Sequence, residues 1–308
     1  MKAGTFTSGV REGLVRALML SGLGFLWLCT RLPFRVQAAA GRGFGRIAYA
    51  VYPYRKDVAL TNLRLCFPEM GEKEREALVR RHFEAMGIGL FEVGMAWWAP
   101  DRRLKGLARV EGMEHLRRLR KEGRGALLLT AHFTTLEIVG RFVNLGHRFS
   151  CLYRKPNDPT VAKYMTRSRE RLMERIIHFD DMVGLIRALK AGDHVWYAPD
   201  QGKLFKYTAL LPFFGEPAVT NTATSRIAKM AGAVIVPFFG RREGDGTYTV
   251  TIYPPLEDIP GESPEADARA VNKLLESFIR TAPDQYFWLH KRFKNRGADY
   301  PDPYAAKS

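Results

Sequence analysis

Short uncharged runs alternate with longer amphipathic segments through most of the chain after residue 120. The apolar runs that predict β-strands are 125–130, 149–153, 195–198, 234–238 and 248–253. Apolar side chains recur at helical spacing in 137–145, 161–175, 182–191, 222–231 and 267–281. Short buried strands separated by helices predict an α/β fold, in which a mostly parallel sheet is flanked by helices.

The N-terminal part of the chain contains an uncharged stretch close to the length of a membrane helix. Residues 17–30 lie between Arg16 and Arg31 and carry no charge, whereas roughly 20 residues cross a bilayer unaided. Both arginines can extend their charged heads toward lipid headgroups, which lengthens the usable span to 14–34. We therefore predict a membrane-anchoring helix, with a buried core helix as the alternative. The basic residues that follow directly disfavour a cleaved signal peptide.

The segments next to this stretch are also predicted to be helical. Residues 36–55 mix arginines with aromatic and aliphatic side chains, as in helices that rest on anionic headgroups. Helical spacing continues in 56–66 and 71–99. We expect two parts: residues 1–55 as a membrane anchor with a basic juxtamembrane helix, and residues 56–308 as one catalytic domain.

The charge balance predicts an anionic partner. The chain has 48 Lys and Arg against 32 Asp and Glu, a net charge of +16. No zinc-finger spacing, RNA-binding aromatic motif or basic-leucine heptad accompanies this charge, so we expect no nucleic acid as partner. The three cysteines are sparse and irregularly spaced, which argues against disulfides or a metal site and indicates a reducing compartment.

One histidine and one glutamate form the candidate catalytic pair. His132 follows the predicted strand 125–130, and Glu137 comes five positions later. On a regular helix that spacing is about 500°, so the two meet only if His132 lies in the turn before the helix and Glu137 in its first turn. An imidazole can take a proton from an attacking hydroxyl, and a carboxylate beside it fixes its tautomer. The alternative is a capping box, in which Glu137 pairs with Thr134 at the helix start.

Other catalytic motifs are absent from the sequence. It contains no GxSxG elbow, Walker A loop, HExxH motif or Cys/His spacing for a metal. We therefore expect neither a metal nor a cofactor.

The residues around His132 bring in a family resemblance. AHFTTLEIVGR resembles the H-x4-D/E motif of the glycerolipid and lipid A acyltransferases. Further landmarks, in matching order, resemble the late acyltransferases of lipid A biosynthesis: NLRLCFPEM (62–70), FEVGMAWWAPDRRL (91–104), VEGMEHL (110–116), YRKPNDP (153–159), VWYAPDQ (195–201), LPFFG (211–215) and QYFWLHKRFKNR (285–296). The most similar type is the lauroyl or palmitoleoyl transferase.

The resemblance implies a specific reaction. Such an enzyme is anchored in the inner membrane with its active site at the cytoplasmic face. It moves an acyl chain from acyl carrier protein to the free 3-hydroxyl of a hydroxyacyl chain on Kdo-bearing lipid IV-A. His132 is then the general base and Glu137 its partner, and the positive charge meets sugar phosphates, Kdo carboxylates and the acidic carrier protein.

Four further residues are candidates for substrate binding. Arg154 resembles the family's arginine at the end of the next strand, and Asp200 follows the apolar run 195–198. Arg292 and Lys294, in the aromatic and basic C-terminal segment, are candidates for phosphate contacts. For each of them, a structural or solvent-exposed role is the alternative.

Some features leave other substrates open. Family members often follow the Asp-Gln or Asp-His of VWYAPDQ with Asp-Tyr-Gly, whereas this chain has GKLFK at 202–206. The basic residues of 117–121 are candidates for carrier-protein binding or form a plain exposed face. The alternative functions are an acyltransferase on a glycerophospholipid or another glycolipid, and a non-catalytic basic protein that binds membrane lipid.

Overall fold

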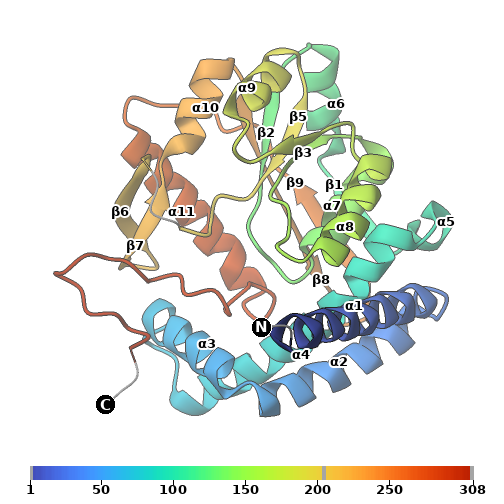
Figure 1. Ribbon diagram of the computed structural model, residues 1–308. Helices are drawn as coiled ribbons and strands as arrows, with labels where there is room; N and C mark the ends of the chain where they lie inside the picture. The colour runs from blue at the N-terminus through green and yellow to red at the C-terminus, as the bar shows by residue number, and fades with distance from the viewer. Residues whose placement is uncertain (1–2, 203–205, 306–308) are drawn as a thin grey trace.

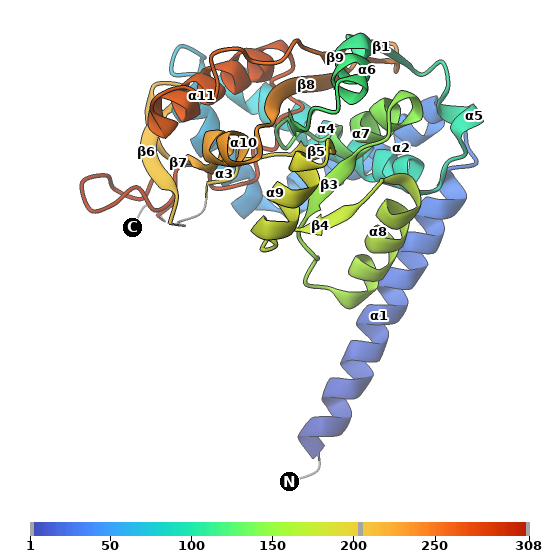
Figure 2. The ribbon, with the colours of Figure 1, turned by 90° about the horizontal axis from the view of Figure 1, so that it is seen from above.

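The computed structural model describes residues 3–202 and 206–305. The N-terminal helices of this part are α1 (Ala3–Cys29), α2 (Phe34–Val51), α3 (Pro53–Cys66) and α4 (Glu72–Trp98). The N-terminal part of α1 projects away from the body of the molecule (Figure 2), whereas the helix also contacts α4 and α8. Helices α2, α3 and α4 pack beside one another (Figure 1). The region is helical as predicted, except that the single helix predicted over 36–55 is divided at Tyr52 between α2 and α3. Helix α3 runs through the predicted domain boundary at 55/56, and the division into two parts stays a prediction.

Glycines let α2 and α4 approach closely. A Cβ atom on Gly87 of α4 would lie 2.0 Å from the Gly41 carbonyl oxygen of α2, and one on Gly45 would lie 2.2 Å from the Phe83 carbonyl oxygen. Real Cβ atoms do not come this near to backbone, so only glycine permits the contact. The crossing fastens α2 to the body of the molecule.

The prediction of a membrane-spanning α1 is not supported. Residues 3–29 are helical, as expected, but none of the helices in the described residues combines the length and the apolar character needed to cross a membrane. Several large apolar side chains of α1 are nevertheless exposed, among them Leu14, Leu18 and Leu28.

Seven strands of the described residues form one mostly parallel sheet, which confirms the predicted α/β fold. Their order is β1-β9-β8-β2-β5-β3-β4, and only the β8–β9 pair is antiparallel. The bounds are β1 (Ala108–Glu111), β2 (Ala126–Leu129), β3 (Ser150–Tyr153), β4 (Ile176–His178), β5 (His194–Tyr197), β8 (Val234–Arg242) and β9 (Tyr248–Ile252). The short strands β1 and β4, at the two edges, were not predicted.

Helices cover both faces of this sheet (Figure 1). They are α5 (Asp101–Leu104), α6 (Met113–Lys121), α7 (Leu136–Gly146), α8 (Pro159–Leu172), α9 (Met182–Lys190), α10 (Ala223–Ala231) and α11 (Pro264–Thr281). Alternate residues of β2 enter different cores: Leu127 and Leu129 pack with residues of α9, α10 and α11, whereas Ala126 and Leu128 pack with residues of α6 and α7. A strand buried on both faces therefore has no polar alternation, which explains its continuous apolar sequence.

A separate β-hairpin, absent from our predictions, lies between β5 and α10. Its strands are β6 (Thr208–Phe213) and β7 (Glu216–Asn221), and Phe214 and Gly215 both have positive φ in the turn. The hairpin packs on α11, on the opposite side of the molecule from α5 and α8 (Figures 1 and 2).

Candidate active site

Three neighbouring strands end at the same edge of the sheet, and each is followed by a candidate residue. His132 comes three residues after β2, Asp200 three residues after β5, and Arg154 directly after β3. These strands are adjacent, in the order β2-β5-β3, and parallel. The carboxyl ends of parallel strands are where α/β folds place their ligands.

His132 is bound to Asp200 at two points. Its ring Nδ1 lies 2.6 Å from Asp200 Oδ1, and its backbone N–H donates to Oδ2 over 3.1 Å. The Tyr286 hydroxyl donates to the same Oδ2, also over 3.1 Å. The Asp200 side chain is 1% exposed, while that of His132 is 33% exposed. The carboxylate is thus buried beneath an imidazole whose other side reaches solvent.

The electrostatics of this pair favour a charged Asp200. Burial alone raises the pKa of the Asp200 carboxyl, but the His132 imidazole, two hydrogen bonds from His132 and the Arg292 guanidinium together lower it. Burial likewise lowers the pKa of His132, and the Asp200 carboxylate outweighs it, so that this pKa is raised. An ionised Asp200 accepts a hydrogen bond from Nδ1–H, which leaves Nε2 unprotonated in the neutral ring and able to take a proton.

The loop that carries His132 is held by the C-terminal segment of the chain. The backbone N–H of Phe287 donates to the His132 carbonyl over 2.9 Å, and that of Thr134 donates to the Gln285 carbonyl over 2.7 Å. The Gln285 side chain bonds both the N–H and the carbonyl of Arg242, each over 2.9 Å. The imidazole is therefore positioned by backbone contacts on both sides, which limits its movement toward or away from a substrate.

Glu137 does not have the partner that we predicted. His132 precedes α7 and Glu137 lies in its first turn, as the spacing required. However, the Glu137 carboxylate accepts hydrogen bonds from Arg169 over 2.5 Å and from the Trp97 indole over 3.2 Å. In this structure the side chain that contacts the imidazole is Asp200 and not Glu137, and a catalytic role of Glu137 stays a prediction. The capping-box alternative is wrong, because α7 has Thr135 as its N-cap residue and no side-chain cap.

A cavity of about 330 Å³ opens beside His132. Its walls are mostly apolar, and its polar lining residues include two arginines, Arg154 and Arg169. The apolar lining residues include Leu136, Leu152, Met165, Phe179 and Trp196. Such a cavity suits an apolar chain that carries a polar or negatively charged group at one end.

The two arginines of the cavity differ in exposure. Arg154 is exposed and stacks over the Phe179 ring, with 5.0 Å between the guanidinium carbon and the ring centroid. Arg169 is 8% exposed. Burial lowers the pKa of Arg169, but the adjacent Glu137 outweighs this effect and raises it, so the guanidinium stays charged. Arg169 was not among the predicted site residues, because its contact with Glu137 joins two helices and leaves no local pattern.

The predicted residues of the C-terminal segment lie further from the cavity. Arg292 is 4% exposed, and its guanidinium donates to the Val219 carbonyl over 2.6 Å and to the Thr220 hydroxyl over 3.1 Å. It is thus bound to β7 and acts on Asp200 through its charge, and the structure does not show the predicted contact surface for a substrate phosphate. Lys294 is partly exposed, and its charge contributes to lowering the pKa of His290, after the larger effect of burial.

The basic end of α6 is not part of this site. Residues 117–121 precede the first residue of β2, whereas His132 follows its last one. Residues 117–121 therefore lie near the amino ends of the parallel strands, whereas His132 lies near their carboxyl ends. This placement does not favour the prediction that residues 117–121 bind a carrier protein that delivers its acyl chain to His132.

Comparison with known proteins shows the family of the chain. The family model for bacterial lipid A biosynthesis acyltransferases matches residues 10–295. The lipid A biosynthesis lauroyltransferase of Escherichia coli K12 is 40% identical over 285 residues, which cover 92% of this chain and 93% of the relative. The palmitoleoyltransferase of the same strain is 36% identical, with 89% and 90% covered.

Among solved structures, the 1-acyl-sn-glycerophosphate acyltransferase PlsC of Thermotoga maritima aligns with 83% of this chain and 100% of its own. Its sequence identity is 14% and its TM-score 0.38, a likeness too distant to carry an argument about this site. The family model spans residues 10–295, which include His132 and Asp200, and the two relatives from Escherichia coli cover 92% and 89% of the chain. The chain belongs to the bacterial lipid A biosynthesis acyltransferase family, and it is an acyltransferase.

Proposed function

We propose that the enzyme transfers a fatty acyl chain from acyl carrier protein to the 3-hydroxyl of a hydroxyacyl chain on Kdo-bearing lipid IV-A. The observation that carries this proposal is the His132–Asp200 pair at the mouth of an apolar cavity with arginines in its wall. The names of the relatives support a lipid A precursor as the acceptor. An acidic carrier protein and a phosphorylated, carboxylated acceptor also suit a chain with a net charge of +16.

The reaction needs one base and no covalent enzyme intermediate. The acceptor hydroxyl gives its proton to His132 Nε2 while its oxygen attacks the thioester carbonyl, forming a C–O bond and a tetrahedral oxyanion. The oxyanion then collapses, the C–S bond breaks, and the departing thiolate takes the proton back from the imidazolium. Asp200 stabilises the imidazolium through its hydrogen bond to Nδ1.

We also propose that Arg169 acts on the thioester. Its guanidinium lines the cavity, is almost completely buried, and is held by Glu137. A fixed cation in such a place stabilises the negative charge that develops on the carbonyl oxygen more than it does in water. Glu137 then contributes by positioning Arg169, and the exposed Arg154 binds a phosphate or carboxylate of the acceptor.

The acceptor is a membrane lipid, and two helices offer a surface for the membrane. Val36, Phe44, Ile47 and Val51 are exposed along one side of α2. Exposed apolar side chains of α1 add to them. Such helices, flanked by arginines, lie in the interface between headgroups and acyl chains. On this basis the protein binds the cytoplasmic face of the inner membrane through α1 and α2.

A mass-spectrometric acyl-transfer assay tests the proposal. Purified wild-type protein in detergent is given Kdo-bearing lipid IV-A and a panel of acyl carrier protein thioesters, and His132→Ala serves as the base-free variant. We expect wild type to add one acyl chain and His132→Ala to be slower by at least about 10³-fold, as for the loss of a general base with its electrostatic partner. Acylation of a lysophospholipid in place of lipid IV-A would reject the acceptor, and an equally active His132→Ala would reject the mechanism.

A further inference from the structure

A second cavity lies between α5, α7 and α8, away from the edge of the sheet where His132 meets Asp200. Its volume is about 600 Å³, and we call it the arginine cavity because Arg141, Arg148 and Arg171 line it. Asp101 also lines it, so the charged lining residues sum to three positive and one negative, or +2. Trp98 and Leu145 supply part of its apolar wall.

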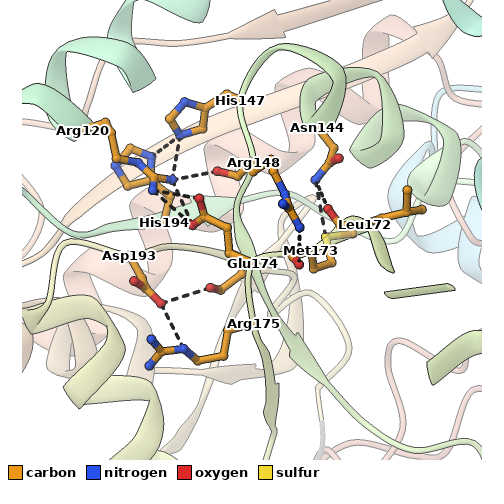
Figure 3. Close-up of polar contacts among 11 residues, drawn as sticks. Arg120, Asn144, His147, Arg148, Leu172, Met173, Glu174, Arg175, Asp193 and His194 are labelled. Carbon is orange, nitrogen blue, oxygen red and sulfur yellow. Dashed lines mark hydrogen bonds and ion pairs between the residues drawn. The ribbon is translucent and has the colours of Figure 1, made fainter. Parts of the chain in front are cut away.

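The three arginines use few of their hydrogen-bond donors within the described residues. Arg141 pairs with the Asp101 carboxylate, Arg148 donates to the Met173 carbonyl over 3.0 Å, and Arg171 donates to the Trp97 carbonyl. A guanidinium has five N–H donors. Arg148 and Arg171 are exposed, so their remaining donors are accessible to a ligand. The Arg148 contact is drawn in Figure 3.

Arg141 gives the most direct indication that the cavity binds a ligand. Its side chain is 6% exposed, and in the described part of the chain its buried Nε–H finds no hydrogen-bond partner. The partner that it has, Asp101, is 62% exposed and therefore only partly compensates the buried charge. A buried cation with an unused donor costs free energy unless an anion completes its coordination.

The arginine cavity is connected to the helices that we assign to the membrane. Arg103 of α5 donates to the carbonyls of Arg31 and Leu32, in the turn between α1 and α2, over 2.7 and 2.9 Å. Leu28 and Leu32 are exposed at this turn. The α5 wall of the cavity therefore lies beside the turn between α1 and α2, next to exposed apolar side chains.

We propose that the arginine cavity binds a phosphate group, with Arg141, Arg148 and Arg171 as its ligands. The several oxygens of a phosphate can accept hydrogen bonds from more than one guanidinium group, and the apolar wall accommodates the part of the ligand next to it. The phosphate comes from an acidic phospholipid headgroup or from a soluble phosphate ester. The phosphate site itself is independent of the proposed reaction, whereas a headgroup as the source depends on the proposed membrane contact.

Binding measurements on the full chain test this site. Isothermal titration of the detergent-solubilised protein uses inorganic phosphate and glycerol 3-phosphate as probes. The double variant Arg148→Gln/Arg171→Gln removes two exposed charges, and Arg117→Gln/Arg118→Gln on α6 is the matched control, since both of those arginines are also exposed. We expect saturable binding by wild type and control, and at least about tenfold weaker binding by the cavity variant.

The source of the phosphate is distinguished by vesicle co-sedimentation. If phosphatidylglycerol in phosphatidylcholine vesicles increases the binding of wild type more than that of the cavity variant, the source is a lipid headgroup. If both bind vesicles equally while the soluble probes still distinguish them, the source is a soluble phosphate ester. Absence of saturable binding by wild type, or equal affinity of the correctly folded cavity variant, overturns the proposal. Because the readout is binding, neither result depends on acyl transfer.

Discussion

Replacing Asp200 with asparagine separates its role from that of Glu137. The Asp200 carboxylate accepts hydrogen bonds from three groups: His132 Nδ1 at Oδ1, and the His132 backbone N–H and the Tyr286 hydroxyl at Oδ2. In Asp200→Asn the amide oxygen can take the Oδ2 position and keep two of these bonds. The amide NH₂ then faces Nδ1, which must become an acceptor, and the proton moves to Nε2.

That change removes the base from the reaction. An imidazole protonated at Nε2 cannot take the hydroxyl proton, and the imidazolium loses its neighbouring negative charge. The comparable substitution in a Ser-His-Asp triad costs about 10⁴-fold in kcat, so we expect a loss of about 10³- to 10⁴-fold, equivalent to about 4–5.5 kcal/mol of activation free energy. Folding should be little affected, because the side chain keeps its shape and most of its hydrogen bonds.

Single-turnover acyl transfer, followed by mass spectrometry with saturating thioester, measures this loss. Circular dichroism melting of the same samples shows whether Asp200→Asn is folded. The reasoning is refuted if folded Asp200→Asn stays within tenfold of wild type. It is also refuted if Glu137→Gln proves as inactive as His132→Ala while Asp200→Asn is active, because Glu137 would then be the partner of the imidazole.

Three other predictions follow from ion pairs, burial and close packing in the structure. Glu137→Gln and Arg169→Gln should each lower kcat by about 10- to 100-fold, and the double variant should be no worse than the poorer single one, since the two side chains act together; additive losses in the kinetic cycle would contradict this. His82 is fully buried, and burial lowers its pKa from 6.5 to about 4. Between about pH 4 and pH 6.5 the unfolded state binds a proton on His82 and the folded state does not. The neutral, buried His82 therefore contributes fully to the free energy of unfolding above pH 6.5, and about 3 kcal/mol of this free energy is lost as the pH falls to about 4. When urea unfolding is measured against pH, the free energy of unfolding of His82→Leu should change less steeply with pH than that of wild type. Gly87→Ala places a methyl group 2.0 Å from the Gly41 carbonyl oxygen and should lower the unfolding free energy by about 1–3 kcal/mol in denaturant titrations, whereas Gly43→Ala, which meets nothing within 4 Å, should not.

Local patterns were sufficient for the elements of the main sheet. Apolar runs predicted β2, β3, β5, β8 and β9 because each strand is buried over most of its length. Strands β1 and β4 have three or four residues and only partial burial, and the β6–β7 hairpin alternates irregularly, so none of them produced a distinct pattern.

Of the paired residues of the site, the sequence identified those that follow a predicted strand but not the contact between them. His132 and Asp200 each follow a buried strand, and both were candidates on that ground. Their pairing was missed because they are 68 positions apart and nothing local links them. The family motif drew attention to Glu137, whose side chain bonds Arg169 of α8 instead. The burial of Arg292 beneath β7 likewise depends on tertiary packing that a basic segment does not reveal.

The backbone contacts of residues 285–287 have a consequence for how the enzyme matures. His132 and Asp200 are synthesised well before Tyr286 and Phe287, yet the loop between β2 and α7 takes its position from those later residues. A ribosome-bound chain that lacks them has the imidazole and the carboxylate but not the backbone that holds them. On the proposed mechanism, acyl transfer therefore begins only after residues 285–287 have packed beside this loop, and a chain that lacks them stays inactive.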